Sequence, residues 1–506
     1  MASLLFGLDV GTTSVAAVAL STDGAVRAAK SREHGADLTP SEDWESLQDP
    51  QSIFETACGL LGELEAEAGT PDALGVCCQM HGAVYTGPDG KAVSPLYTWL
   101  DGRGDLPAVE FGGGESYAAR LSRLSSRALS TGFGAVTHHV LSQWQHVPKN
   151  AGRLMTIGDY VAARLCGATR PLTDATPAHS LGIYDAAEGR WDENLCELAN
   201  LGPELLPEVV PSGAILGEVG ETFGSIRRRA PGGGKPAGIP VAVATGDNPA
   251  GFLGTVGDPT NTAALSIGTS GQITVLLEEA ASIPTVDVRP FPGNRFIGVG
   301  ASLTGGKSYA ILRSFFEKAL ESFGGGTEAV SYERMNELAA AAYRRLEAET
   351  EDEAARNETL RRQEGLELRP QSGPLRDPRA PIVDTRFQGS RVEPDARGRI
   401  LNLDGANFEP GMLTLAMLGG MVGELRMYYK AFPEQVRRNM SRVAVTGNAI
   451  RRNPLLQQII SDYFDSPVAV RRHSEEAAVG AAMVSGVGVG VWPGFLEAAP
   501  LVESLQ

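Results

Sequence analysis

The chain has 506 residues, of which 42% are hydrophobic, and it carries 44 Lys and Arg against 61 Asp and Glu, a formal net charge of −17. Because domains of roughly 100–200 residues are typical, this length predicts two large lobes or three units. A negative field of this size repels polyphosphate backbones and anionic membrane surfaces, so nucleic acid and membranes are excluded as expected partners. No stretch reaches the roughly 18 apolar residues that a membrane span needs.

The amino terminus and the cysteines indicate a reducing compartment. The first residues, MASLLFGLDVGTTS, lack the basic region of a secretory signal and carry an acidic residue at position 9. The five cysteines form no CxxC pair, and the adjacent Cys77 and Cys78 lie in an apolar run typical of buried core. We therefore expect a cytoplasmic protein.

The start of the chain alternates strands with a helix. Residues 4–10 form an almost wholly apolar strand, and residues 15–21 and 25–33 predict a second and third strand around a turn at Asp23-Gly24. Apolar residues at helical spacing predict a helix over 50–69, and residues 73–80 return to a buried strand. This alternation predicts an α/β fold class.

Two changes of composition divide the rest of the chain. Residues 227–240 are basic and rich in glycine and proline, and an apolar strand follows at 241–245. We therefore expect a lobe boundary near residue 243, with lobes at 1–243 and 244–506; a surface loop inside the first lobe is the alternative. Charged residues dominate between about 324 and 380, which favours a solvated helical insertion over a binding role.

One glycine turn occurs twice. GLDVGTT at 7–13 and ALSIGTS at 264–270 each place a glycine and two hydroxyl residues after an apolar strand. Such a turn lets backbone N–H groups point at an anion without a Cβ in the way, so one copy from each lobe predicts a triphosphate site. For a single copy, a plain hairpin turn is the alternative. Asp9 of the first copy occupies the position that Ser266 has in the second copy, so only the first copy carries a carboxylate. This makes Asp9 a candidate to hold Mg²⁺.

Asp247 follows the strand at 241–245 and precedes a helix expected from Pro249. Ligands of α/β proteins bind at the ends of strands near such a junction. A helix N-cap is the alternative role for this carboxylate. Phosphoryl transfer to an alcohol needs a group that accepts the hydroxyl proton, and a carboxylate near Mg²⁺ is the usual solution. Asp247 is therefore a candidate catalytic base.

Two further segments are candidates to contact a nucleotide. Residues 443–470 read as strand, glycine turn at Gly447, helix and strand. Together with the small residues of 474–486, this turn could form a slot for an adenine ring, although small residues on a helix more often serve packing. ASLTGGKS at 301–308 lacks the first glycine of a P-loop, so we expect it only to open a helix at the cleft.

These motifs together resemble the FGGY carbohydrate kinases, a branch of the actin-like ATPase superfamily, in the expected order through almost the whole chain. The resemblance implies an α/β fold of two ribonuclease H-like lobes around a central cleft, with ATP mainly against the second lobe and sugar mainly against the first. By position, the family's roles fall on Asp247 as base; Asp9 and Asp247 at Mg²⁺; Thr12, Thr13, Gly268 and Thr269 at the phosphates; Gly447, Asn448 and Asn453 near adenosine; and Gln79, Met80, His81 and Asp247 at the sugar.

The acceptor expected from the resemblance is a ketose. The elements QMHG and TWLDGR are most similar to the family's kinases of sedoheptulose, whereas MHG is shared with kinases of xylulose, so xylulose or another sugar is the alternative. Asp101 and Arg103 of TWLDGR are expected to brace one another rather than touch substrate. We expect a monomer or homodimer whose partners are this sugar and MgATP.

Two positions depart from the family pattern. Ala16 stands where a Lys or Arg usually follows the first phosphate turn, which keeps a catalytically weak sugar- or nucleotide-sensing pseudokinase as an alternative of another class. Lys307 is the candidate to replace that cation from the other lobe. Asn448 stands in place of a glycine and is expected to be tolerated if its backbone adopts the left-handed conformation.

Overall fold

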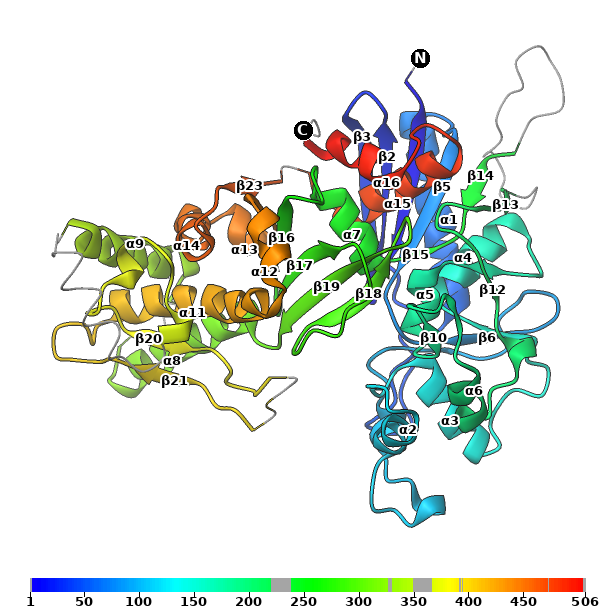
Figure 1. Ribbon diagram of the computed structural model, residues 1–506, viewed down its shortest axis with the longest axis horizontal. Coiled ribbons are helices and arrows are strands. Elements are labelled where there is room, and N and C mark those ends of the chain that lie inside the picture. Colours follow the sequence, from blue (N-terminus) through cyan, green and yellow to red (C-terminus); the bar gives the residue numbers. More distant parts are fainter. Residues whose placement is uncertain are drawn as a thin grey trace.

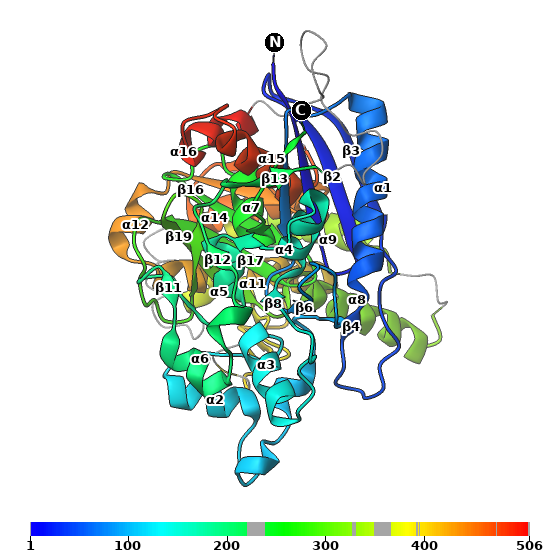
Figure 2. The same ribbon diagram turned by 90° about the vertical axis from the view of Figure 1, so that its right-hand side faces the viewer.

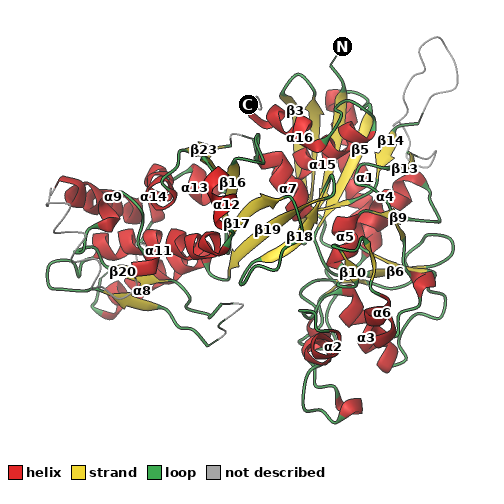
Figure 3. Cartoon of the chain, in the orientation of Figure 1, coloured by secondary structure: helices red, strands yellow, loops and turns green. Residues whose placement is uncertain are grey.

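The computed structural model of the chain describes residues 2–219, 238–325, 330–348, 366–390, 393, 395–471 and 473–503. Two mixed sheets with helices against their faces form two lobes that meet along α7 (Asp247–Thr255) and α15 (Glu476–Gly488) (Figures 1 and 3). Most of the glycine-rich segment at 227–240 lies outside the described residues, so the boundary near residue 243 stays a proposal. Among the helices of the described residues, none has the length and apolar character that crossing a membrane requires.

The sheet of the first lobe has the strand order β13-β14-β5-β1-β2-β3, with β15 beside β5. The first three strands form the antiparallel meander that the sequence predicts, and β5 adds parallel to β1. The apolar strand expected at 241–245 is divided between two short strands, β14 and β15. The strands are β1 Leu4–Val10, β2 Ser14–Ser21, β3 Ala25–Glu33, β5 Ala73–Cys78, β13 Ile215–Glu218, β14 Pro240–Ala242 and β15 Thr245–Gly246.

Helix α1 (Pro50–Ala68) packs against β2 and β3, and Figure 2 shows it along the outer face of this sheet. The Asp49 side chain caps its start by accepting hydrogen bonds from the backbone N–H groups of Gln51 and Ser52. Gly69 ends the helix at a φ of 95°, a conformation that residues with a side chain rarely adopt. The helix predicted over 50–69 is therefore confirmed.

Smaller elements extend the first lobe beyond its sheet, and α2, α3 and α6 gather below it in Figure 1. They are β4 Leu47–Gln48, β6 Val84–Thr86, β7 Leu96–Tyr97, α2 Tyr117–Ser125, α3 Gly134–Gln143, β8 Arg153–Met155, α4 Ile157–Cys166, β9 Leu172–Thr173, α5 Ala175–Ser180, β10 Tyr184–Asp185, β11 Arg190–Trp191, α6 Glu193–Ala199 and β12 Glu208–Val209. In this region Arg103 Nε lies 2.5 Å from Asp101 Oδ1 and both side chains are buried, so the expected brace is confirmed.

The second sheet repeats the plan of the first. Its order is β18-β19-β17-β16-β22-β23, in which β16, β17 and β19 form an antiparallel meander and β22 runs parallel to β16. The repeated sequence motif therefore marks a repeated strand-turn-strand structure. The strands are β16 Thr262–Ile267, β17 Gly271–Leu277, β18 Asp287–Phe291, β19 Arg295–Ser302, β22 Arg442–Thr446 and β23 Val468–Val470, with β20 Ile382–Asp384 and β21 Arg399–Leu401 forming a separate pair.

Among the helices of the second lobe, α11 (Pro410–Ala431) is buried along most of its length and packs against α8, α9 and α14. The others are α8 Gly305–Ser322, α9 Tyr332–Ala348, α12 Glu434–Asn439, α13 Asn448–Arg451, α14 Pro454–Phe464 and α16 Phe495–Ala498. The charged segment predicted as a solvated insertion supplies α9, whose buried face, including Met335 and Tyr343, packs on α11. The predicted helix with solvated charges is therefore confirmed for α9, whose charged side chains occupy the exposed face, while its packing on α11 was not foreseen. Residues 349–365 lie outside the described part.

Helix α15 belongs to the carboxyl-terminal half of the chain but packs against β1, β5 and α7. Glycines make this close approach possible. A Cβ at Gly7 would lie 1.8 Å from Ala478 O, and one at Gly480 would lie 1.8 Å from Ala250 O. The small residues considered for an adenine slot therefore serve helix packing. A continuous apolar cluster joins β1, β2, α7, α15 and the second sheet.

Candidate active site

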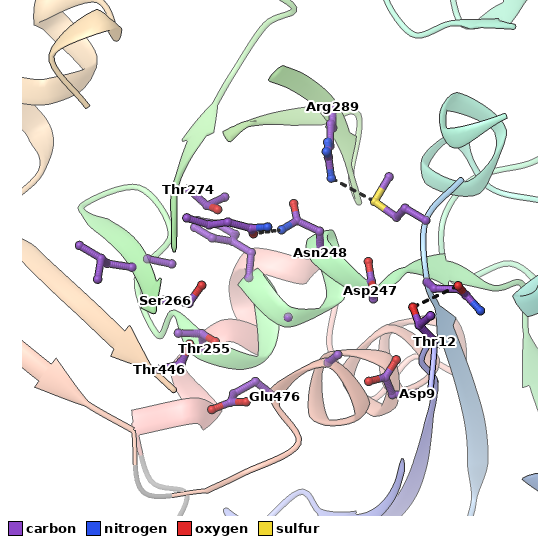
Figure 4. A pocket seen from close by; sticks show the side chains of 18 of the residues that line it. Asp9, Thr12, Asp247, Asn248, Thr255, Ser266, Thr274, Arg289, Thr446 and Glu476 are labelled. Carbon is purple, nitrogen blue, oxygen red and sulfur yellow. Dashed lines mark hydrogen bonds between the residues drawn. The ribbon is translucent and has the colours of Figure 1, made fainter. Parts of the chain in front are cut away.

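A pocket of about 470 Å³ opens between the two sheets (Figure 4). It is lined from the first sheet, from both helices between the sheets and from the second sheet. The lining residues used below are Asp9, Thr12, Gln79, Met80, His81, Trp99, Asp247, Asn248, Ser266, Gln272, Arg289, Thr446, Glu476 and Ala477. The structure therefore brings Asp9, Thr12, Gln79, Met80, His81 and Asp247 together, as the sequence predicts.

Asp9 and Asp247 face this pocket from different elements. Asp9 lies on β1 between Ala16 of β2 and Cys77 of β5, and the Cys77 thiol donates to Asp9 Oδ1 at 3.4 Å. Burial, reinforced by the negative charge of Asp247, raises the pKa of Asp9 to about 7. Asp247 is the first residue of α7, two residues earlier than the helix start expected at Pro249. Burial raises the pKa of Asp247 to about 6, and the positive charge of Arg289 opposes that rise.

This pair of carboxylates fits a magnesium site. Among the described residues no group of three or more His, Cys, Asp or Glu side chains could hold a metal ion by itself. Mg²⁺ commonly takes one or two carboxylates and completes its octahedron with substrate phosphates and water. A divalent cation near Asp9 and Asp247 would also neutralise the mutual repulsion that raises the pKa of Asp9.

The QMHG motif lines the first-lobe side of the pocket. Gln79 Oε1 accepts from Thr12 Oγ1 at 3.2 Å, and Thr12 Oγ1 accepts from Trp99 Nε1 at 3.0 Å. His81 has a φ of 65° and stacks on Phe133 with ring centroids 4.2 Å apart. Burial lowers the pKa of His81 to about 3, so the ring is neutral. Nδ1 of this neutral ring donates to Ser180 O at 2.9 Å, which leaves Nε2 as a hydrogen-bond acceptor.

Asn248, Gln272 and Arg289 are among the polar residues of this pocket that the sequence did not predict. Asn248 follows Asp247, and its Nδ2 donates to Gln272 Oε1 of β17 at 3.1 Å. Arg289 of β18 points into the pocket, where its Nη1 lies 3.4 Å from Met80 Sδ. Their neighbours Asp247 and the GTSG turn were signals for Asn248 and Gln272. Arg289 lies in no motif, and only the pairing of β18 with β19 brings it to the site.

A second pocket, of about 680 Å³, lies beside the first along the ends of β16 and β22. Ser266 and Thr446 line the first pocket, whereas Gly268 and Asn448, each two residues further on, line the second. The second pocket also contains Thr269, Gly306, Lys307 and Asn453. The helix α8, expected to open at 301–308, begins at Gly305 and presents Gly306 and Lys307 to this pocket.

Helix α9 also contributes to the second pocket, through Tyr332 and Asn336. Asn336 Oδ1 accepts from Tyr309 Oη at 2.7 Å and from Asn453 Nδ2 at 3.0 Å, and the rings of Tyr309 and Tyr332 stack. The charged segment, for which no binding role was expected, thus places the start of α9 at the second pocket. The start of α9 is far in sequence from the glycine turns, so the sequence held no signal that it would lie beside them.

Two of the predicted phosphate and adenosine residues do not line either pocket. Thr13 is exposed at the turn after β1, and its carbonyl accepts from His34 N at 3.2 Å. Gly447 has a φ of 97°, and a Cβ there would lie 2.7 Å from Ile267 O. Gly447 thus holds the turn after β22 against the end of β16. Asn448 begins α13 with a negative φ, so the expected left-handed conformation is absent at Asn448 and the positive φ belongs to Gly447 instead.

Comparisons with known proteins identify the chain's relatives. Models of the FGGY family of carbohydrate kinases match it twice, the N-terminal domain over residues 4–254 and the C-terminal domain over residues 263–489. It is 27% identical over 521 residues to a sedoheptulokinase of Mus musculus, covering 94% of this chain and 96% of that protein. It is 26% identical over 529 residues to a glycerol kinase of Trichlorobacter lovleyi, covering 100% and 94%.

A solved structure shows the same fold. The xylulose kinase from Rhodospirillum rubrum matches with a TM-score of 0.76 at 20% sequence identity, covering 98% of this chain and 92% of that one. The expected architecture of two ribonuclease H-like lobes, the actin-like ATPase fold, is confirmed. The chain belongs to the FGGY family of carbohydrate kinases.

Proposed function

We propose that the protein transfers the γ-phosphate of ATP to a primary hydroxyl of a ketose, with sedoheptulose as acceptor and sedoheptulose 7-phosphate as product. The observation that carries this proposal is the position of Asp247, which faces a pocket between the lobes beside the glycine-turn pocket of the second lobe. The similarity to sedoheptulokinase over 94% of the chain supports the choice of acceptor. Xylulose is the alternative, because xylulose kinases are also among the relatives.

The nucleotide occupies the second pocket in this proposal. The stacked Tyr309 and Tyr332 and the amide of Asn336 offer an apolar face and polar groups for the base. In the turn at Gly268 and Thr269 the Gly268 N–H donates to Ser270 O at 2.9 Å. The Thr269 N–H is therefore the group of this turn that meets the phosphates, which point toward Thr12 and Asp9 in the adjoining pocket. The adenine ring therefore lies away from Asp9 and Asp247, and the γ-phosphate of the nucleotide lies near these two carboxylates.

The sugar lies against Gln79, Met80 and His81. His81, held neutral, accepts a hydrogen bond from a sugar hydroxyl at Nε2, and Met80 packs against carbon. Asp247 accepts the proton of the reacting hydroxyl as its oxygen attacks the γ-phosphorus, and the bond from phosphorus to the β–γ bridging oxygen breaks to release ADP. A Mg²⁺ ion held by Asp9 and Asp247 would neutralise phosphate charge.

The basic residue usual after the first phosphate turn is absent here. Ala16 is buried beside Asp9 on β2 and offers no charge. Lys307 lines the nucleotide pocket from the start of α8, where Nζ donates to Gln388 Oε1 at 2.9 Å. We propose that Lys307 supplies the missing positive charge from the second lobe. The absence at position 16 also favours one rival function, a sensor that binds sugar and nucleotide without turnover.

ADP release measured over sedoheptulose, xylulose and glycerol, with ATP saturating, tests the proposal. The proposed function predicts ADP formation that depends on added sugar and is fastest with sedoheptulose. If xylulose is turned over fastest, xylulose replaces sedoheptulose as the proposed acceptor, and the proposed reaction class is unchanged. Binding of sugar and ATP without ADP formation indicates the sensor, and ADP formation indifferent to sugar indicates an ATPase.

A further inference from the structure

Arg289 is the one cationic side chain among the described residues that line the pocket between the lobes, where the other charged side chains are Asp9, Asp247 and Glu476. It comes from β18, at the edge of the second sheet, and reaches across to the first lobe. Its Nη1 lies 3.4 Å from the sulfur of Met80, in the motif proposed to hold the sugar. Helix α5 of the first lobe packs against β18, so this reach is supported by contact between the lobes.

Asp287 holds the guanidinium in place. Arg289 Nε donates to Asp287 Oδ2 at 2.8 Å, and Nη2 lies 2.7 Å from the same oxygen. The two residues are separated by one position on β18 and therefore project from the same face of the strand. The Arg289 side chain is only 11% exposed, so its orientation is fixed by this pairing and by its surroundings.

The end of the guanidinium that faces the pocket has spare donors. An arginine side chain carries five N–H groups. In Arg289, Nε and Nη2 are the atoms that pair with the Asp287 carboxylate. In the part of the chain that the structure describes, Nη1 has only a thioether, a weak acceptor, within hydrogen-bond distance. A largely desolvated cation with unmatched N–H groups is expected to bind oxygen atoms of a ligand.

Figure 4 shows where that ligand would extend. Asp9 and Glu476 lie at one end of the pocket, Arg289 lies at the other, and Asp247 with Asn248 lies between them. A hydroxyl that reacts at Asp247 must meet the phosphate on the side of Asp9. The remaining carbons of the acceptor then run past Met80 toward Arg289, where only an acceptor with a longer chain places an oxygen.

We infer that Arg289 is a specificity-determining residue, contributed by the second lobe, that binds oxygens of a polyhydroxylated acceptor remote from the reacting hydroxyl. The inference rests on the proposed function, because it assigns a residue to the acceptor of that same site. It predicts that Arg289 favours acceptors with long chains over short ones. An arginine that serves only as the ion-pair partner of Asp287 would not distinguish acceptors by length.

Steady-state kinetics with Arg289→Gln over glycerol, xylulose and sedoheptulose test the inference. The kinetics are measured at pH 8, where Asp247 stays ionised even without the Arg289 charge that opposes the rise of its pKa. Loss of charge-assisted hydrogen bonds is then expected to raise KM for sedoheptulose about 10- to 100-fold, with kcat, the KM for ATP and the efficiency with glycerol little changed. Arg289→Lys keeps the charge and is expected to recover part of the loss. Arg295→Gln is the matched control, because Arg295 pairs with Glu278, the residue that follows β17, and does not line the pocket.

The outcomes separate the inference from its alternatives. Equal losses with all three acceptors, a fall in kcat alone, or wild-type kinetics in Arg289→Gln would each overturn it. Calorimetric titration of sedoheptulose into the wild type and Arg289→Gln covers the case in which the wild type turns over no sugar. Weaker binding by the variant then supports the role of Arg289 while the proposed function fails, whereas equal binding, or no binding by the wild type, overturns the inference.

Discussion

Replacing Gly480 by alanine tests the packing of the helices that join the two lobes. A Cβ at this position would lie 1.8 Å from Ala250 O, 2.5 Å from Ala250 C and 3.0 Å from Ala250 Cα. All three atoms belong to the backbone of α7, so no side chain can rotate away. Cβ contacts below 3.0 Å essentially never occur, so α7 and α15 would have to separate by roughly 1 Å in a tightly packed interior.

The expected cost follows from this displacement. Overpacking of well-packed cores costs typically 1–3 kcal/mol and occasionally more, and a clash with backbone belongs at the upper end, about 3 kcal/mol. For lobes of this size each kcal/mol lowers Tm by roughly 2–4 °C, so Gly480→Ala should lower it by about 6 °C or more. Because α7 begins with Asp247, turnover should also fall.

Differential scanning calorimetry of Gly480→Ala beside Gly62→Ala measures the effect. Gly62 lies inside α1, and a Cβ there meets nothing within 4 Å. This control should gain stability, by about 0.5–1 kcal/mol, since alanine favours a helix over glycine. A Tm of Gly480→Ala within 2 °C of the wild type, a margin well inside the roughly 6 °C expected, would refute the close packing of α15 on α7.

Three further predictions address the nucleotide pocket and the first lobe. Asn336→Ala should raise the KM for ATP about tenfold, because the loss of one hydrogen bond weakens binding by roughly this factor. The KM for sugar should be unchanged. An unchanged KM for ATP would show that α9 does not contact the nucleotide. Lys307→Gln should lower kcat about 10²- to 10³-fold if this cation stabilises the transferring phosphate, and activity near the wild type would show that the charge comes from elsewhere. Burial raises the pKa of Asp159 to about 7, so the native state binds more protons than the unfolded chain below that pH and loses stability as pH rises toward 7. Thermal scans at several pH values should therefore show that the Tm of Asp159→Asn, relative to the Tm of the wild type, rises between pH 5 and pH 7. A difference in Tm that does not depend on pH would contradict the raised pKa.

The sequence predicts those parts of the fold that depend on local pattern. Strand β1, helix α1 and the repeated glycine turns could be placed because apolar periodicity, capping and turn chemistry act over a few residues. Asp9 was placed beside the first glycine turn for the same reason, whereas the role of His81 came from the family resemblance. The assembly of these motifs into one pocket followed from the family resemblance, since spacing alone does not show which strand ends meet.

The features that were missed depend on contacts between distant segments. Arg289 reaches Met80 only because β18 pairs with β19 at the edge of the second sheet, next to the first lobe. The start of α9 joins the nucleotide pocket although its composition is that of a solvated helix. The small residues of α15 indicated close packing but not the partner, which is the first sheet and α7 rather than a nucleotide.

The proposed reaction depends on Asp247 accepting the proton of the sugar hydroxyl during phosphoryl transfer. The most direct test follows sugar phosphate formation by ³¹P NMR with the wild type and Asp247→Asn, which keeps the shape of the side chain and removes its basicity. Equimolar sugar phosphate and ADP are expected with the wild type. The variant should react about 10²- to 10⁴-fold more slowly, the usual contribution of a general base, while still binding sugar. An Asp247→Asn rate within tenfold of the wild type would contradict the account.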